Sequence, residues 1–172
     1  MLTPQAAAGI RALHEAGIMI AAITDQPAIR CADHAGADVS HVQAAVSELL
    51  QREGVRLDGW YSCPHAPDED CLCRKPHSGL LRAFTLEHSL DLSRGVIIGD
   101  TTSDIDLGNR TGIPAILLAT GCGPDVDAPT RRQAPYVCGN LSEASANFLG
   151  KEGLTEPDPL PGPLGSINSG WL

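Results

Sequence analysis

The sequence predicts an α/β fold, a parallel sheet with helices on both faces. Short apolar runs, each too brief for a helix, alternate along the chain with amphipathic helical segments. Such alternation is typical of parallel strands joined by helices, and ligands then bind outside the carboxyl ends of the strands. Three of the runs end on polar residues, Thr24, Asp100 and Thr120. We therefore expect the functional edge of the sheet at these residues.

Local signals predict the individual elements. Thr3 as N-cap and Pro4 at the first helical position start a first helix, and Gly17 ends it. Ser40 and Gln43 have the spacing of a capping box at the start of a second helix. The apolar face of that second helix is expected to hold Val42, Ala45, Val46, Leu49 and Leu50. Strands are expected over 18–23, 60–62, 96–98 and 115–118, and further helices over 80–88 and 103–112.

Length and charge restrict the class of protein. The 172 residues suffice for one domain, expected over residues 1–148, and the Pro- and Gly-rich stretch 149–172 is expected to be a disordered tail. A net charge of −9 argues against nucleic-acid and anionic-membrane partners. The first residues do not resemble a signal peptide, and no apolar run approaches the roughly 18 residues of a membrane span. A cytoplasmic monomer is expected.

A cluster of cysteines and a histidine predicts a metal site. The chain has six cysteines, and three of them fall within eleven residues beside His65. Three thiolates and one imidazole complete a tetrahedral zinc site, and a site with four protein ligands is structural because it leaves no position for water. The alternative, a loop with incidental free cysteines, is disfavoured because all the ligands share one short turn. The predicted zinc ligands are Cys63, His65, Cys71 and Cys73.

Two further motifs indicate phosphate chemistry. Arg74 and Lys75 directly follow the last cysteine of the loop, and fixed cations of this kind are suited to phosphate, although solvated surface cations are the alternative. Asp100 and Asp104 lie one turn apart where a strand ends and a helix begins, and carboxylate oxygens there suit Mg²⁺. For Asp104 taken alone, a helix cap is the favoured role.

Three segments together resemble the haloacid dehalogenase (HAD) superfamily, in the zinc-containing branch that includes D-glycero-D-manno-heptose 1,7-bisphosphate phosphatase and histidinol-phosphatase. The resemblance covers roughly residues 3 to 145, the size of one domain. It implies a Rossmann-like fold, carbohydrate metabolism, a phosphorylated sugar as substrate, structural Zn²⁺ and catalytic Mg²⁺. The segments are Ile23-Thr24-Asp25-Gln26, Cys63-Pro-His65 with Cys71-Leu-Cys73-Arg74-Lys75-Pro76, and Ile98-Gly99-Asp100-Thr-Thr-Ser-Asp104.

The resemblance implies a role for each matching residue. Thr24 would bind the transferring phosphate, with Gln26 beside it, and Lys75 would neutralise the phosphate charge. Asp100 would ligate Mg²⁺ and Asp104 would support that site, while Arg74 would help to select the substrate. Where the family usually has Thr-Asn-Gln-Ser-Gly, this chain has Thr-Asp-Gln-Pro-Ala over 24–28. The departure places the acidic residue Asp25 near the expected phosphate.

The family nucleophile has no counterpart in this sequence. Members carry an Asp-x-Asp-Gly motif after a strand that precedes the first helix, and this strand lies centrally in their sheet. The Asp-x-Asp pairs of this chain follow no apolar strand. We expect the complete protein to begin roughly 30 residues earlier, the length of one strand with its connection. Without that strand, activity and stability are expected to be incomplete.

The resemblance leaves three functions open. The first is hydrolysis of a sugar phosphate monoester, most like the 7-phosphatase reaction on heptose 1,7-bisphosphate, once the missing strand is supplied. The second is hydrolysis of histidinol phosphate by the same zinc-containing scaffold. The third belongs to another class: a non-catalytic, zinc-stabilised module that binds a phosphorylated ligand or a partner.

Overall fold

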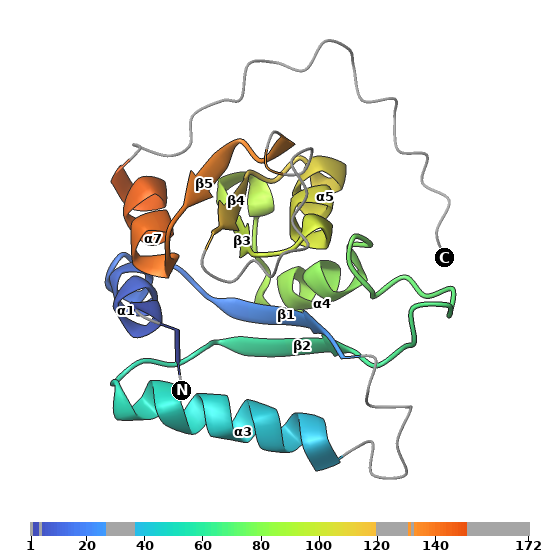
Figure 1. The fold of residues 1–172 in the computed structure, drawn as a ribbon, viewed down its shortest axis with the longest axis horizontal. Helices are drawn as coiled ribbons and strands as arrows, with labels where there is room; N and C mark the ends of the chain where they lie inside the picture. The colour runs from blue at the N-terminus through green and yellow to red at the C-terminus, as the bar shows by residue number, and fades with distance from the viewer. Residues whose placement is uncertain (1, 4, 27–36, 120–130, 132, 151–172) are drawn as a thin grey trace.

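The computed structural model describes residues 2–3, 5–26, 37–119, 131 and 133–150, and for residues 37–39 the backbone alone. Helices and strands alternate along these residues, and helices flank the parallel strands (Figure 1). The predicted α/β fold class is confirmed. The elements are α1 (Ala6–Glu15), β1 (Ala21–Asp25), α3 (Ala37–Arg52), β2 (Gly59–Cys63), α4 (Gly79–His88), a 3₁₀ turn (Leu92–Arg94), β3 (Ile97–Gly99), α5 (Thr102–Thr111), β4 (Ala115–Leu118), β5 (Tyr136–Cys138) and α7 (Leu141–Gly150).

The described strands form two parallel sheets. In one sheet β1 pairs with β2, with Thr24 opposite Ser62 and Asp25 opposite Cys63. In the other, β4 lies between β3 and β5. Among the described strands, β1 and β3 therefore each hydrogen-bond to a neighbouring strand along one side only. The division falls between β1 and β3, where the resemblance places the missing central strand.

The backbone of β1 has one side turned away from β2. The Gln26 amide donates to the Cys63 carbonyl of β2 at 2.9 Å. Backbone groups of successive residues in a strand point to opposite sides, so the carbonyl of Ile23 lies on the side away from β2. This edge is open to a hydrogen-bond donor that does not belong to β2.

One apolar cluster joins the β1–β2 sheet to the helices around it. Ile10 of α1 and Leu50 of α3 are 5% and 2% exposed and pack together with Val55. Leu141, the first residue of α7, packs against the same cluster. Full burial of a side chain of this size contributes about 1.5–3 kcal/mol. In Figure 1, α1 and α7 lie side by side, so this cluster connects the two halves of the described chain.

β4, the middle strand of the second sheet, is buried on both faces. Ala115 and Leu117 of β4 pack against Ile105 of α5. Ile116, which points to the opposite face, packs with Cys138 and with Ala144 of α7. A strand covered on both faces consists of consecutive apolar residues. The sequence therefore predicts β4 with the observed bounds. Cys138 is a buried small side chain of this core.

Both predicted helix starts are wrong. α1 begins after Gln5, which has a left-handed backbone (φ 64°) and no side-chain cap, and Pro4 lies outside the described residues. Thr3 contributes a carbonyl that accepts from the amide of residue 6 at 3.2 Å, not a side-chain cap. Ser40 lies inside α3, because the helix begins three residues before it. Gln43 donates instead to the Ser62 hydroxyl at 3.0 Å.

The predicted apolar face of α3 is only partly confirmed. Val42 is 54% exposed and Ala45 is exposed, whereas Val46 and Leu50 pack into the cluster. The inner face runs through Gln43, which contacts β2, so packing against the sheet rotates the helix relative to the apolar pattern. β1 also begins later than predicted.

The C-terminal part of the described chain contains two elements absent from the sequence prediction, β5 and α7. α7 ends at Gly150, so the predicted domain boundary after residue 148 falls within its last turn. Thr120 lies outside the described residues, and so does the part of the predicted tail beyond residue 150. Within the described ranges, no helix combines the length and apolar character needed to cross a membrane.

Gly9 permits the close approach of α1 to α7 and provides a test of this packing. A Cβ at position 9 would lie 2.7 Å from the carbonyl carbon of Leu141. We predict that Gly9→Ala lowers the free energy of unfolding by about 1–3 kcal/mol through overpacking, although alanine itself favours a helix. Gly150→Ala is the matched control, because its added Cβ has no neighbour within 4 Å. Urea denaturation of both variants measures the free energy of unfolding. A Gly9→Ala protein as stable as the parent would contradict the described contact.

Candidate active site and metal centre

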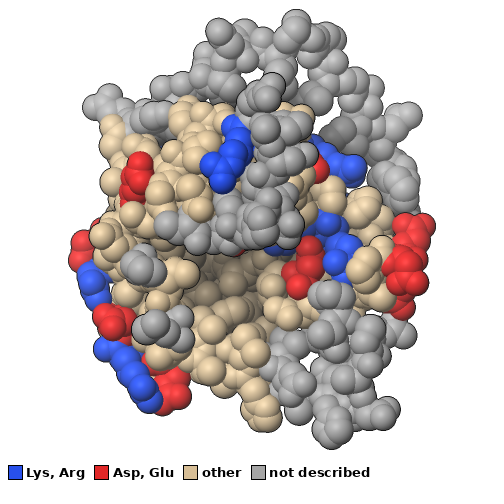
Figure 2. Space-filling view, viewed as in Figure 1, with Lys and Arg blue, Asp and Glu red and all other residues tan. Residues whose placement is uncertain are grey.

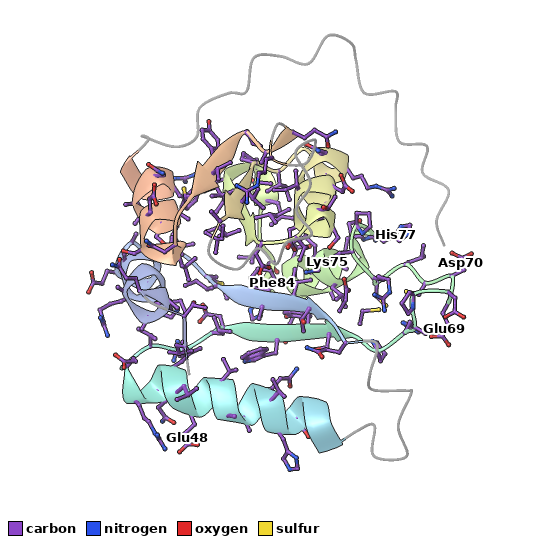
Figure 3. All side chains as sticks on the ribbon, viewed as in Figure 1. Glu48, Glu69, Asp70, Lys75, His77 and Phe84 are labelled. Atoms are coloured by element: carbon purple, nitrogen blue, oxygen red, sulfur yellow. The ribbon has the colours of Figure 1, made fainter. Side chains whose placement is uncertain are left out.

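The predicted site residues lie at the carboxyl ends of the strands. Thr24 is the next-to-last residue of β1, Lys75 follows the cysteine loop, and Asp104 lies in the first turn of α5. Lys75 lies between the two sheets, whereas Glu69 and Asp70 lie at the outer end of the loop (Figure 3). The same face is hollowed near its centre, with basic and acidic side chains next to each other along one rim (Figure 2).

The four predicted metal ligands converge. One ligand atom from each of Cys63, His65, Cys71 and Cys73 lies within 4.8 Å of the other three. The sulfur–sulfur distances are 3.2 Å for Cys63–Cys73 and 3.7 Å for both Cys63–Cys71 and Cys71–Cys73. Zinc–sulfur bonds of about 2.3 Å in a tetrahedron place sulfurs about 3.7 Å apart. The cluster therefore fits a single tetrahedral metal ion.

Backbone contacts shape the cysteine loop for this cluster. The backbone N–H of Arg74 donates to the Cys71 sulfur and lowers the pKa of that thiol, which favours the thiolate that binds metal. Burial and, secondly, the hydrogen bond with the Cys63 sulfur raise the pKa of Cys73 to about 12. Sulfurs packed this closely are stabilised as thiolates by a cation among them.

Glycine permits the loop to close against α4. The Gly79 amide donates to the Leu72 carbonyl at 3.0 Å, and a Cβ at this glycine would collide with that carbonyl. The Glu69 carboxylate accepts from the Ala66 amide at 2.8 Å and closes the outer turn. The conformation of the loop is therefore fixed at both its outer and its inner end.

Lys75 connects β1 to α5. Its Nζ donates to the carboxylate of Asp104 at 2.8 Å and to the Ile23 carbonyl at 3.2 Å. The Lys75 and Asp104 side chains are only 12% and 9% exposed, so the charges are paired in a partly desolvated position. The ammonium thus occupies the open side of β1 at its carboxyl end.

Asp104 has two functions in this geometry. With Thr101 it forms the capping box of α5, because its Oδ2 accepts from the Thr101 amide at 3.1 Å and from the Thr101 hydroxyl at 2.6 Å. Its other oxygen accepts from Lys75. The favoured role of Asp104 as a cap is confirmed, and the same carboxylate also orients Lys75. Gly99 leaves the space that this side chain needs, since a Cβ there would collide with it.

The end of β1 is tied to both sides of the cysteine loop. The Gln26 side chain donates to the Thr24 hydroxyl at 3.1 Å, and the Gln26 amide bonds to Cys63. Asp25 accepts from the backbone amide of Lys75 at 3.3 Å. Thr24 and Gln26 therefore lie together, as expected, next to the segment that carries Lys75.

Arg74 lies inside the loop. Its guanidinium donates to the His65 carbonyl, and its Nε is buried without a hydrogen-bond partner among the described residues. The side chain is therefore at least partly used to close the cysteine loop.

Asp100 follows β3 at the same edge of the sheet, and its Mg²⁺ role stays a prediction. Two groups that contact the site were not predicted from the sequence: the backbone carbonyl of Ile23 and the side chain of Thr101. For Thr101 a signal was present, because Thr101-x-x-Asp104 has capping-box spacing.

Comparison with known proteins shows the family of this chain. Residues 72–144 match the HAD-hydrolase-like family. The D-glycero-alpha-D-manno-heptose-1,7-bisphosphate 7-phosphatase of Photorhabdus laumondii is 30% identical over 127 residues, which cover 69% of this chain and 69% of that protein. The chain belongs to the HAD-like phosphatases. The recognised resemblance is thereby confirmed, and members of this family are phosphoric monoester hydrolases.

Two further likenesses bear on this HAD-like phosphatase. The crystal structure of D,D-heptose 1,7-bisphosphate phosphatase from B. bronchiseptica, complexed with magnesium and phosphate, has a TM-score of 0.74 at 23% identity and covers 87% of this chain and 84% of that one. It confirms the fold. The histidine biosynthesis bifunctional protein HisB of Blochmanniella floridana is 35% identical over 69 residues, which cover 40% of this chain and 19% of that protein.

The Lys75–Asp104 pair gives a stability prediction. Lys75→Met leaves the Asp104 carboxylate without its cation in a nearly buried position, so we expect a loss of about 3 kcal/mol in the free energy of unfolding. Arg52→Met is the control, because the Arg52–Glu48 pair is 68% and 63% exposed and is expected to contribute about 0.5 kcal/mol or less. Equal losses in the two variants, measured by urea denaturation, would show that the central pair does not stabilise the fold.

Proposed function

We propose that this HAD-like phosphatase hydrolyses a phosphate monoester of a phosphorylated sugar, with D-glycero-D-manno-heptose 1,7-bisphosphate as its preferred substrate. The observation that carries the proposal is the partly buried Lys75 ammonium at the carboxyl ends of the strands, next to Thr24 and on the same edge as Asp100. The name and 69% coverage of the Photorhabdus laumondii relative support the sugar.

Each residue has a proposed role in binding and charge neutralisation. Lys75 neutralises the transferring phosphate, the Thr24 hydroxyl donates to a phosphate oxygen, and Gln26 orients that hydroxyl. Arg74 is proposed to contact the rest of the substrate through the guanidinium N–H groups that its contact with the His65 carbonyl leaves available. Asp100 would hold Mg²⁺, which supplies charge neutralisation at the phosphate when bound. Asp104 acts through Lys75, which it orients.

The carboxylate that attacks phosphorus is proposed to belong to a strand between β1 and β3. The open sides of these two described strands support this position. The Ile23 carbonyl lies on this open side of β1 and accepts from Lys75 Nζ, so a strand along this side would pass beside the cation. Attack by the carboxylate would break the bond between phosphorus and the sugar oxygen, release the sugar hydroxyl and give an aspartyl-phosphate. Water would then hydrolyse the aspartyl-phosphate to the free carboxylate and inorganic phosphate.

The cysteine loop is proposed to bind one structural Zn²⁺ through Cys63, His65, Cys71 and Cys73. A closed site of four ligands would hold the residues that follow it in position and would take no part in the chemical step. Since Arg74 and Lys75 are the next residues, the metal would fix the cationic part of the phosphate site.

The zinc site gives a prediction for metal content. The purified protein is expected to contain about one zinc per chain, and Cys71→Ser and Cys73→Ser are each expected to lose it and part of the stability. Asp70→Asn is the control, because Asp70 lies in the same loop but is exposed and outside the ligand cluster. Elemental analysis after dialysis measures the content. A parent protein that is free of metal and folded would exclude a structural zinc.

The catalytic proposal is tested by phosphate release in the presence of Mg²⁺. The chain is assayed as printed and with an added N-terminal strand ending in Asp-x-Asp-Gly, on heptose 1,7-bisphosphate and on histidinol phosphate. The extended protein is expected to hydrolyse the heptose bisphosphate faster, and Lys75→Met is expected to lower kcat/KM by about 100-fold or more. Arg82→Met, on the exposed side of α4, is the control and is expected to leave the rate unchanged.

The outcomes of this assay separate the three functions. Faster turnover of histidinol phosphate would favour the second function, for which the HisB likeness covers a shorter segment of the chain. An extended, zinc-containing protein that binds phosphate tightly but releases none from either substrate would support the non-catalytic binding module and would contradict the proposed hydrolase.

A further inference from the structure

Lys75 is held at two points of the residue. Its ammonium contacts Ile23 and Asp104, as described above, and its backbone amide donates to the Asp25 carboxylate at 3.3 Å. The two points are far apart along a flexible side chain of four methylenes. Fixing the ammonium alone would leave the backbone free to shift, whereas fixing both ends defines where the ammonium can reach.

Asp25 of β1 carries the carboxylate that accepts from the Lys75 backbone amide. It is the last residue of the strand and pairs in register with Cys63, the first metal ligand. Among the described residues, its carboxylate makes one side-chain hydrogen bond, the one to Lys75. The loop that carries Lys75 is otherwise closed on itself here, because the His77 amide bonds to the Arg74 carbonyl at 2.8 Å.

We propose that Asp25 is a positioning residue for Lys75 and tunes the affinity of the site for phosphate. The inference rests on the proposed phosphate-binding role of Lys75. The carboxylate has two opposing effects. As an acceptor it holds the Lys75 backbone in the orientation that favours anion binding. As a negative charge it repels the same anion, so the residue limits phosphate affinity while it orders the cation.

The two effects are separable by substitution. Asp25→Asn keeps an oxygen that can accept from the Lys75 amide but removes the charge. Asp25→Ala removes both. We therefore expect Asp25→Asn to bind inorganic phosphate about two- to fivefold more tightly than the parent. Asp25→Ala is expected to bind it less tightly than Asp25→Asn by about fivefold, the effect of one hydrogen bond.

The experiment uses the full chain with its bound metal and two measurements. Calorimetric titration gives phosphate affinity, and NMR amide hydrogen exchange reports the Lys75 amide directly. We expect exchange at Lys75 to accelerate about fivefold or more in Asp25→Ala and to stay within about twofold of the parent in Asp25→Asn. Metal content shows that each variant retains the loop.

The outcomes distinguish this inference from the proposed function. Unchanged Lys75 exchange in Asp25→Ala overturns the positioning role, whatever the phosphate affinity. An Asp25→Asn protein that binds phosphate no more tightly than the parent overturns the tuning role of the charge. Equal phosphate affinity in the Asn and Ala variants overturns the contribution of the Asp25 hydrogen bond to that affinity. If Lys75 exchange follows the expected pattern but the parent and both variants fail to bind phosphate, positioning by Asp25 is supported, whereas its tuning role and the phosphate role proposed for Lys75 fail together.

Discussion

The Lys75 ammonium between the Ile23 carbonyl and the Asp104 carboxylate is the interaction on which the site depends. It links β1 to the first turn of α5, and the Lys75 side chain is only 12% exposed. A charge in such a place is stable only when it is paired and hydrogen-bonded. The surrounding elements can therefore be understood by how they bring these three groups together.

Three separate parts of the chain converge on this ammonium. β1 ends beside it, the cysteine loop leads directly into Lys75, and the first turn of α5 holds the carboxylate that faces it. The capping box of α5 fixes Asp104, and the Asp25 contact fixes the Lys75 backbone. Each part is anchored by its own apolar cluster or by the metal-ligand cluster, so the position of the cation depends on the whole domain. An enzyme that transfers phosphoryl groups needs positive charge held in place in this way.

The sequence predicts best what local patterns determine. β4 is predicted with the observed bounds because it is apolar on both faces, and α5 is predicted because Gly112 ends it with a left-handed residue. The four metal ligands are predicted because they lie within eleven residues. Local signals failed at α3, where packing of Gln43 against β2 outweighs the apolar pattern and the apparent capping box lies within the helix.

The sequence could not reveal contacts between distant segments. Asp25 and Lys75 are 50 residues apart, and Lys75 and Asp104 are 29 apart. No spacing rule connects such residues, so their roles came from the resemblance and their contacts from the structure. The carbonyl of Ile23 has no sequence signature at all, because every residue has one.

The most direct test of this account is a crystal structure of the protein with Mg²⁺ and inorganic phosphate. The account predicts the phosphate within hydrogen-bond distance of Lys75 Nζ and the Thr24 hydroxyl, with the magnesium ion bound to Asp100. A phosphate bound elsewhere on the domain, with Lys75 still engaged only by Ile23 and Asp104, would contradict it.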